Sequence, residues 1–310
     1  MTTAYITHPD CLRHEMGRGH PESPQRLSSV NEHVRDSGLL EKLMPLEAPL
    51  ASDAQLKRVH RAAYIDLIFA NAPDEGYVQL DPDTAMNPHS LAAARRAAGA
   101  GILGIETVTS GRAANAFCAI RPCGHHATQS RSMGFCIFNN VAVAAAHALE
   151  HGGVERVAII DFDVHHGNGT EDIFSASEWQ DKVLMAGFFQ HPFYPYSGTV
   201  NPAANMVNVP LAAGSNGALA RQAVEKRWLP ALEDFEPQLL LISAGFDAHR
   251  DDLLGGLALV EDDYVWITRE LMAIAARFAK GRIVSMMEGG YNLTALGRSA
   301  VAHVRTLSTH

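Results

Sequence analysis

The feature that most constrains the fold is a series of short segments in which nearly every residue is apolar. Leu239–Ala244 reads LLLISA and Ile283–Met287 reads IVSMM. Runs of this length and composition are typical of strands that are buried on both faces. The sequence predicts similar strands at Ala4–Thr7, Ala116–Arg121, Val157–Asp163 and Val183–Phe188.

Longer segments with helical periodicity separate these strands. The expected helices are Pro24–Leu43, Pro88–Thr109, Asn139–His151, Gly217–Phe235, Glu261–Lys280 and Ala295–Leu307. Because continuous apolar strands alternate with helices, the pattern predicts an α/β fold with a mostly parallel central sheet covered by helices on both faces. No repeat, charge block or Pro/Gly/Ser-rich linker divides the 310 residues, so we expect one domain over residues 1–310.

The bulk composition limits the classes of partner. A formal net charge of −9 disfavours nucleic acid, since nucleic-acid binding rests on neutralising phosphates, and it suits a cationic substrate. No apolar stretch approaches the ~18 residues of a membrane span, and no secretory signal is visible, so we expect a cytoplasmic protein without a membrane partner. The four cysteines form no C-x-x-C pair, which argues against a zinc ribbon or a thioredoxin-like motif.

Four of the expected strands run into polar segments that contain glycine or histidine. These segments are RPCGHH from Arg121, DFDVHH from Asp161, GFDAH from Gly245 and EGGY from Glu288. Ligands of parallel sheets bind outside the carboxyl ends of the strands. The sequence therefore predicts one composite site at that edge.

The segment AIIDFDVHHGN, residues 158–168, has the composition of a metal site. Side chains alternate along an extended chain, so Asp161, Asp163 and His165 point the same way, and buried carboxylates this close need a cation, a shared proton or strong donors. Carboxylates and imidazoles are typical ligands of first-row metals, and Asp247 would complete a set of three that leaves zinc an open position for water. A hydrogen-bonded strand end without metal is the alternative.

The pair His125–His126 and Tyr291 are the other candidates for chemistry. If one histidine faces an aspartate such as Asp161, that imidazole is held cationic, and the other is nearer neutral and better suited as a general base. The two glycines before Tyr291 let the backbone turn sharply, so that the phenol could donate a hydrogen bond to a developing oxyanion. The alternatives are a solvated turn and a packed tyrosine.

Together these motifs resemble the histone deacetylase superfamily, within the arginase/deacetylase fold. The similarity is to class II-like bacterial histone deacetylase-like amidohydrolases and acetylpolyamine amidohydrolases. HPESPQRL, residues 20–27, resembles the N-terminal signature of the family. The segments that resemble the remaining motifs, in the same order, are 121–126 with 134–136, 161–168, 244–249 and 288–293.

The resemblance implies a role for each candidate catalytic residue. Asp163, His165 and Asp247 would bind one catalytic zinc ion. His125 would pair with Asp161, and His126 would be the general base acting on a metal-activated water.

Three further implications concern the base and the substrate. Asn168 stands where many family members have a second aspartate, which agrees with a less cationic His126. Tyr291 would polarise the scissile carbonyl. Phe135, with Gly134 and Tyr194, would line a narrow tube for an acyl-lysine-like chain.

The resemblance also implies a structural potassium ion near the zinc. Main-chain oxygens of Asp161, Asp163 and His165 and the Asp161 carboxylate would hold it. The sequence departs from the family pattern at Cys123 and Leu253, where the family usually has proline. Both positions lie in loops beside the site and bear on rim shape and substrate choice.

We therefore expect a zinc-dependent deacetylase, an amidohydrolase acting on linear amides, that removes acetyl or another short acyl group from acyl-lysine or acetylpolyamine-type amines. One alternative is a dinuclear arginase-like ureohydrolase, in which His249 and Asp251 bind a second metal. The other is a non-catalytic zinc module that binds acylated ligands. A homo-oligomer is compatible with all three.

Overall fold

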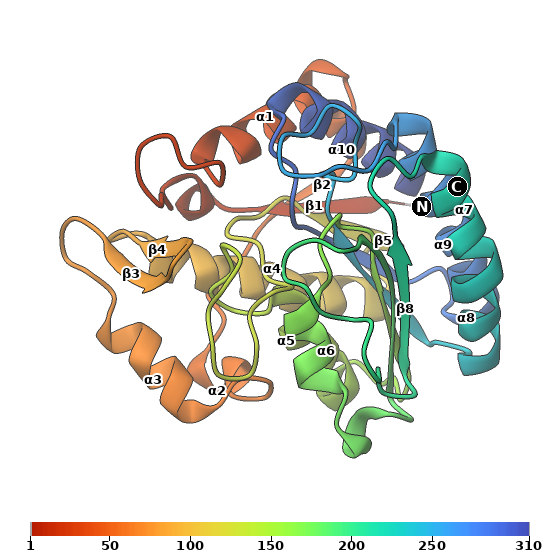
Figure 1. The fold of residues 1–310 in the computed structure, drawn as a ribbon, viewed down its shortest axis with the longest axis horizontal. Coiled ribbons are helices and arrows are strands. Elements are labelled where there is room, and N and C mark those ends of the chain that lie inside the picture. Colours follow the sequence, from red (N-terminus) through yellow and green to blue (C-terminus); the bar gives the residue numbers. More distant parts are fainter. Residues whose placement is uncertain (1, 310) are drawn as a thin grey trace.

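The computed structural model describes residues 2–309 and is built around one eight-stranded sheet (Figure 1). The strands lie in the order β2-β1-β5-β10-β9-β6-β7-β8, and every neighbouring pair is parallel. This confirms the predicted α/β class with a parallel central sheet. The strands are β1 (Thr3–Thr7), β2 (Met44–Glu47), β5 (Asn115–Cys118), β6 (Val157–Asp161), β7 (Val183–Gln190), β8 (Met206–Leu211), β9 (Leu239–Ala244) and β10 (Ile283–Met287).

Helices cover both faces of the sheet (Figure 1). On one face lie α4 (Ser90–Thr109) and α5 (Asn140–His151), and on the other α1 (Pro24–Asp36), α9 (Glu261–Phe278) and α10 (Leu293–Leu307). Two adjacent residues of β10 show the two sides. Gly104 of α4 packs on Val284, whereas Ser285 Oγ lies 2.8 Å from Nε2 of His303 in α10. Because side chains alternate along a strand, α4 and α10 pack on opposite faces.

Shorter elements complete the fold. A small hairpin, β3 (Val78–Asp81) with β4 (Thr84–Met86), stands apart from the main sheet. The remaining helices are α2 (Asp53–Leu56), α3 (Ala62–Ala70), α6 (Asn168–Phe174), α7 (Gly217–Ala223) and α8 (Leu229–Phe235), with single turns at Pro9–Leu12, Leu40–Lys42 and Ser177–Trp179.

Two predicted strands end earlier than expected. Ala116–Arg121 is Asn115–Cys118 in the structure, and Val157–Asp163 is Val157–Asp161. After β6, the Asp161 carboxylate accepts the backbone N–H of Asp163 at 3.1 Å. Such local side-chain bonds compete with the sheet ladder, so the strand stops where the polar segment begins.

Three predicted helices also differ. The first ends at Asp36 instead of Leu43, because Gly38, with φ 68°, terminates it. The second begins at Ser90. Gly217–Phe235 contains a π-helical turn at Val224–Trp228 between α7 and α8. Pro230, which has no N–H to donate, follows that turn.

The sequence reasoning missed the two edge strands, β2 and β8. Their sequences, MPLE and MVNVPL, contain proline and polar residues. An edge strand pairs on one side only, so it tolerates proline and is less apolar than a central strand. The expected pattern of continuous apolar residues is therefore weak at both edges.

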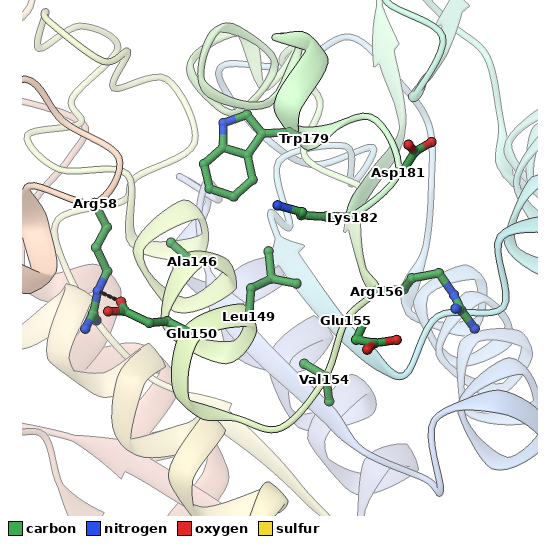
Figure 2. Close-up of a pocket in the computed structure, with 10 residues that line it drawn as sticks. All are labelled: Arg58, Ala146, Leu149, Glu150, Val154, Glu155, Arg156, Trp179, Asp181 and Lys182. Atoms are coloured by element: carbon green, nitrogen blue, oxygen red, sulfur yellow. Dashed lines mark ion pairs between the residues drawn. The ribbon is translucent and has the colours of Figure 1, made fainter.

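A pocket of about 620 Å³ lies at the amino ends of β6 and β7, the sheet edge opposite the polar strand ends (Figure 2). It is formed by the last turns of α5 and by the segments that precede the two strands. Arg58 and Glu150 at one end form an ion pair. None of the helices described between residues 2 and 309 combines the length and the apolar composition of a membrane span.

The central strands predict a strong dependence of stability on their side chains. Leu241 of β9 is fully buried, so Leu241→Ala should lower the free energy of unfolding by about 2–5 kcal/mol through lost burial and a cavity. Leu67→Ala is the matched control, because Leu67 is 54% exposed on α3, and its effect should stay within about 0.5 kcal/mol. Urea unfolding followed by circular dichroism measures both. Equal losses would contradict the assigned burial.

Candidate active site

The polar strand ends meet at one edge of the sheet. Strands β5, β10, β9 and β6 are consecutive neighbours and parallel, so their carboxyl ends lie together. A pocket of about 430 Å³ opens at this edge. Its lining includes His126, Phe135, His165, Tyr194 and Tyr291.

Asp163, His165 and Asp247 form one compact group. Each offers a ligand atom, and these atoms all lie within 4.8 Å of one another. Nδ1 of His165 lies 3.0 Å from Asp163 Oδ1 and 3.3 Å from Asp247 Oδ2. Backbone donors hold the carboxylates: Val164 N–H to Asp247 Oδ1 at 2.8 Å and Gly289 N–H to Asp163 Oδ2 at 2.8 Å.

This group fits a metal ion. Asp247 Oδ2 is buried and accepts no hydrogen bond from the described residues. A Cβ at Gly245 or Gly289 would overlap the carboxylates, so the two glycines leave the space that a ligand sphere needs. Two carboxylates and one imidazole with an open position are a typical donor set for catalytic zinc.

The electrostatics of the group agree with a need for positive charge. Burial lowers the pKa of His165, but its hydrogen bond to Asp163 and the charges of Asp163 and Asp247 outweigh burial and raise the pKa to about 10. Burial and the neighbouring Asp163 charge raise the pKa of Asp247 to about 7. A cation would relieve this excess of negative charge.

The two neighbouring histidines have opposite electrostatic environments. His125 Nδ1 lies 2.9 Å from Asp161 Oδ2. Burial opposes its charge, but Asp163 and Asp161 outweigh burial and raise the pKa of His125 well above its usual range. Burial and the positive charges of His125 and His165 lower the pKa of His126 well below its usual range.

Asn168 determines how the His126 ring is held. Its Oδ1 lies 2.7 Å from His126 Nδ1, while its Nδ2 contacts Met133 Sδ at 3.4 Å. With the amide oxygen toward the ring, His126 Nδ1 carries the proton and Nε2 keeps a free electron pair. This tautomer follows from the hydrogen-bond pattern.

Tyr291 is nearly buried at the same edge. Its backbone N–H donates to Asp252 Oδ2 at 2.6 Å. The Arg26 guanidinium lies over its ring, 4.7 Å from the centroid. Burial raises the pKa of Tyr291 well above its usual range, so the phenol keeps its proton and remains a donor.

Gly134 and Phe135 form a tight turn that presents an aromatic wall. Both have positive φ, 56° and 67°, and Cys136 N–H donates to Met133 O at 3.0 Å to close the turn. A bulky residue with positive φ is uncommon, and such outliers gather at functional sites. The Phe135 ring meets that of Tyr291 edge-on at 5.9 Å.

The opposite wall comes from the loop after β7. Tyr194 packs edge-on against His126, with 5.4 Å between centroids, and Phe193 stacks on His165 at 5.4 Å and 19°. Sequence reasoning selected Tyr194 and missed Phe193, although the two are adjacent. It also missed Asp83, which lines the pocket and accepts the N–H of Gly134 at 3.1 Å.

The largest omission was Glu288. Its carboxylate is fully buried and accepts N–H groups from Gly124 at 2.6 Å and His125 at 3.2 Å, and its other oxygen lies 3.2 Å from Ser243 Oγ. Burial raises its pKa to about 7. The available signal is its place in EGGY, directly after the last residue of β10, where the other candidate strand ends also carry acidic or histidine side chains.

The segment HPESPQRL, residues 20–27, lies against the segments that contain Arg121 and Gly290. Glu22, fully buried, pairs with Arg26 at 3.2 Å and with Arg121, whose Nε lies 2.8 Å from Glu22 Oε1. Arg26 also donates to the main-chain oxygens of Gly290, at 2.6 Å, and Glu288. This network joins α1 to the segments that carry the histidine pair and Tyr291.

Two further histidines lie outside this chemistry. His166 bonds Ser197 Oγ at 2.8 Å and Glu171 Oε2 at 2.8 Å and so ties the loop after β7 to α6. His249 contacts Asp251 and Glu261. Within residues 2–309, neither His249 nor Asp251 joins a metal-binding group.

Comparisons with known proteins agree with the geometry. The family model described as "Histone deacetylase domain" matches residues 20–307. A histone deacetylase-like amidohydrolase from Pseudomonas aeruginosa is 38% identical over 297 residues, 94% of this chain and 77% of that protein. A probable deacetylase from Archaeoglobus fulgidus is 33% identical over 301 residues, 94% and 82% of the two chains.

A solved structure agrees as well. The crystal structure of the HDA15 HD domain superimposes with a TM-score of 0.91 at 33% identity and covers 99% of this chain and 89% of that one. The similarity to this family therefore includes the fold and extends over most of the sequence. The protein belongs to the histone deacetylase family of hydrolases, with the arginase/deacetylase fold.

Proposed function

We propose that this protein is a zinc-dependent deacetylase that removes acetyl or another short acyl group from acyl-lysine or acetylpolyamine-type amines. The observation that carries the proposal is the group Asp163, His165 and Asp247, reached through an aromatic pocket that also contains His126 and Tyr291. Asp163, His165 and Asp247 would hold the zinc ion. When bound, zinc would polarise the amide carbonyl and lower the pKa of water to about 7.

His126 is the proposed general base. Its Nδ1–H is directed to Asn168, which leaves Nε2 as the free acceptor for a proton of the attacking water. A base must be neutral before it reacts, and the lowered pKa of His126 keeps it neutral at physiological pH. After attack, the same nitrogen can return the proton to the leaving amine.

His125 has a different proposed role. Paired with Asp161, it keeps a positive charge beside the reacting group. That charge favours negative charge that develops on the substrate oxygen, and it also lowers the proton affinity of the adjacent His126. The ring centroids of the two histidines are 4.1 Å apart, which makes this coupling direct.

Tyr291 would donate its phenolic hydrogen to the developing oxyanion. The Arg26 contact and the Asp252 bond position the ring and its backbone, and the raised pKa keeps the donor protonated. Phe135, Phe193 and Tyr194 form aromatic walls that suit a linear aliphatic chain better than a branched or bulky one.

A potassium ion beside the zinc is part of the proposal and rests mainly on the family resemblance. The Asp161 carboxylate is buried, and burial raises its pKa, so a nearby cation would stabilise its charge. A hard cation prefers carbonyl and carboxylate oxygens, as main-chain atoms of Asp161, Asp163 and His165 would supply.

The two rival functions receive less support. A dinuclear ureohydrolase needs a second group of ligands, and His249 contacts Asp251 and Glu261 instead of the first group. A binding module needs neither a neutral base nor a buried phenol, yet His126 and Tyr291 fill both positions. Quantification of one metal ion per chain, rather than two, would separate the deacetylase from the ureohydrolase.

The direct test is an amide-hydrolysis assay. Zinc-loaded protein should release the fluorophore from an acetyl-lysine or trifluoroacetyl-lysine reporter or deacetylate an acetylpolyamine. A chelator should abolish the activity because the site needs a cation, and added zinc should restore it. If metal-loaded protein hydrolyses none of these substrates, the proposed function is wrong.

Tyr291→Phe tests the proposed oxyanion donor. It keeps the ring and its contacts but removes the hydroxyl, so kcat should fall by about 10²–10³-fold with the fold unchanged. Tyr264→Phe is the matched control, because the buried Tyr264 hydroxyl has no hydrogen-bond partner among the described residues. It should retain nearly full activity. An equal loss in both variants would show that the hydroxyl of Tyr291 has no special role.

Asn168→Asp tests the electrostatics of the base. A carboxylate 2.7 Å from His126 Nδ1 would stabilise the imidazolium and raise the pKa of His126. Since the base must be neutral, the acid limb of kcat/KM against pH should move to higher pH. Asn168→Ala, which removes the bond without adding charge, should not move it upward. An unmoved limb in Asn168→Asp would exclude His126 as the base.

A further inference from the structure

Two buried thiols lie in contact behind the pocket. Cys136 Sγ is 3.5 Å from Cys123 Sγ, and all four cysteines of the chain are free. Cys123 directly precedes Gly124-His125-His126, and Cys136 directly follows the turn that carries Phe135. The pair therefore spans the two segments that supply the proposed base and one pocket wall.

We propose that Cys123 and Cys136 form a modification site, at which a peroxide converts the two thiols into a reversible disulfide that inactivates the enzyme. The inference goes beyond the proposed deacetylase function and rests on it only for the activity readout. The catalytic steps proposed for this site do not use either cysteine.

The surroundings favour Cys123 as the thiol that reacts first. Cys123 keeps 3% exposure, whereas Cys136 is fully buried. The Cys136 S–H can be donated to Cys123 Sγ and would stabilise negative charge there.

Cys136 is suited to the second step. It is fully buried, and burial together with its hydrogen bond to Cys123 raises its pKa. A protonated, buried thiol reacts slowly with a dissolved oxidant but is already in contact with the sulfur that it must attack. The pair thus has the arrangement of an attacking and a resolving cysteine.

The chemistry balances with hydrogen peroxide as the oxidant. The Cys123 thiol first loses its proton, and the resulting thiolate attacks one peroxide oxygen while the O–O bond breaks. The products are a sulfenic acid and hydroxide, and the hydroxide takes up the released proton to give water. Cys136 sulfur then attacks Cys123 sulfur, the S–O bond breaks, and the second hydroxide leaves as water with the Cys136 proton. The two sulfurs lose two electrons, and the peroxide accepts both.

The pair lies behind the pocket, and peroxide must pass the Gly134 segment to reach it, because Cys123 and Cys136 are 3% and 0% exposed. Both Cys123 and Cys136 contact the carbonyl oxygen of Gly134, at 3.8 and 3.3 Å. Gly134 itself lines the 430 Å³ pocket, as does Tyr291. A ligand pocket that admits an acyl group also admits a molecule of the size of peroxide.

The crosslink would act on the proposed base through close packing. Disulfide formation would shorten the Sγ–Sγ separation from 3.5 Å to about 2.05 Å. Gly134 already packs directly on the His126 ring, without space for a Cβ. The turn can therefore not move toward Cys123 without shifting His126 or Phe135, and a shift near 1 Å costs on the order of 10²-fold in rate.

A metal ion bound by the pair fits less well than a disulfide. Cys123, Cys136 and Glu288 do form a close group of three. Both Glu288 oxygens, however, already contact donors, from Gly124, His125 and Ser243. If Glu288 bound a metal as the third ligand, its carboxylate would have to give up the hydrogen bonds that hold the segment with the histidine pair.

The experiment treats zinc-loaded enzyme with dilute hydrogen peroxide. Proteolysis without reductant, followed by mass spectrometry, should find the Cys123–Cys136 peptide pair lighter by two hydrogen atoms. Deacetylase activity and affinity for a fluorescent hydroxamate should fall together, activity by about tenfold or more, and dithiothreitol should restore both.

Single cysteine variants test whether the loss of activity depends on this pair. Cys123→Ser and Cys136→Ser should each keep basal activity and resist peroxide, whereas Cys118→Ser keeps the pair and should respond like the wild type. Cys123→Ala replaces Cys123→Ser if serine lowers the unfolding midpoint.

Three results would overturn the proposal. They are no crosslinked peptide in the wild type, a crosslink without change in activity or hydroxamate affinity, and equal inactivation of Cys123→Ser. If the reduced enzyme deacetylates nothing, the proposed function has failed, while the crosslink and the hydroxamate affinity still test the thiol pair.

Discussion

The structure depends on how buried negative charge is balanced at one edge of the sheet. Five carboxylates there are almost completely buried: Glu22, Asp161, Asp163, Asp247 and Glu288. Burying a charge is costly unless it is paired and hydrogen-bonded. Backbone N–H groups, two arginines and two histidines partner four of them. In the fifth, Asp247, one oxygen accepts a backbone N–H and the other has no hydrogen-bond donor among the described residues, which supports the proposed cation site. The charge balance and the proposed metal site are therefore the same arrangement.

The sheet and the candidate metal-binding group could be predicted because both follow from local patterns. Apolar runs such as Leu239–Ala244 identify central strands, and the parallel arrangement that they imply brings distant strand ends together. The alternation of Asp161, Asp163 and His165 then indicates a shared face. Asp247 could be added because it follows its own strand in the same way, and the structure does bring its carboxylate next to His165.

What could not be predicted depends on contacts between segments far apart in the sequence. Glu288 accepts hydrogen bonds from the backbone N–H groups of Gly124 and His125. Nearly every residue has such an N–H, so the sequence does not show which residues donate. Phe193 joins the pocket only because the loop after β7 folds over the strand ends. The edge strands were not predicted for a related reason, since a strand with one neighbouring strand need not be uniformly apolar.

The division of labour between the histidines shows why these distant contacts matter for function. His125 and His126 are adjacent in sequence and both buried, so residue type alone cannot give one of them a proton and deny it to the other. The difference lies in their partners: a carboxylate of β6 for His125, and an amide of α6 for His126. Once His125 is cationic, its charge 4.1 Å away opposes a second positive charge, so each imidazole reinforces the state of the other. The proposed role of each histidine thus depends on the fold around the pair, including which oxygen at position 168 accepts the His126 Nδ1–H.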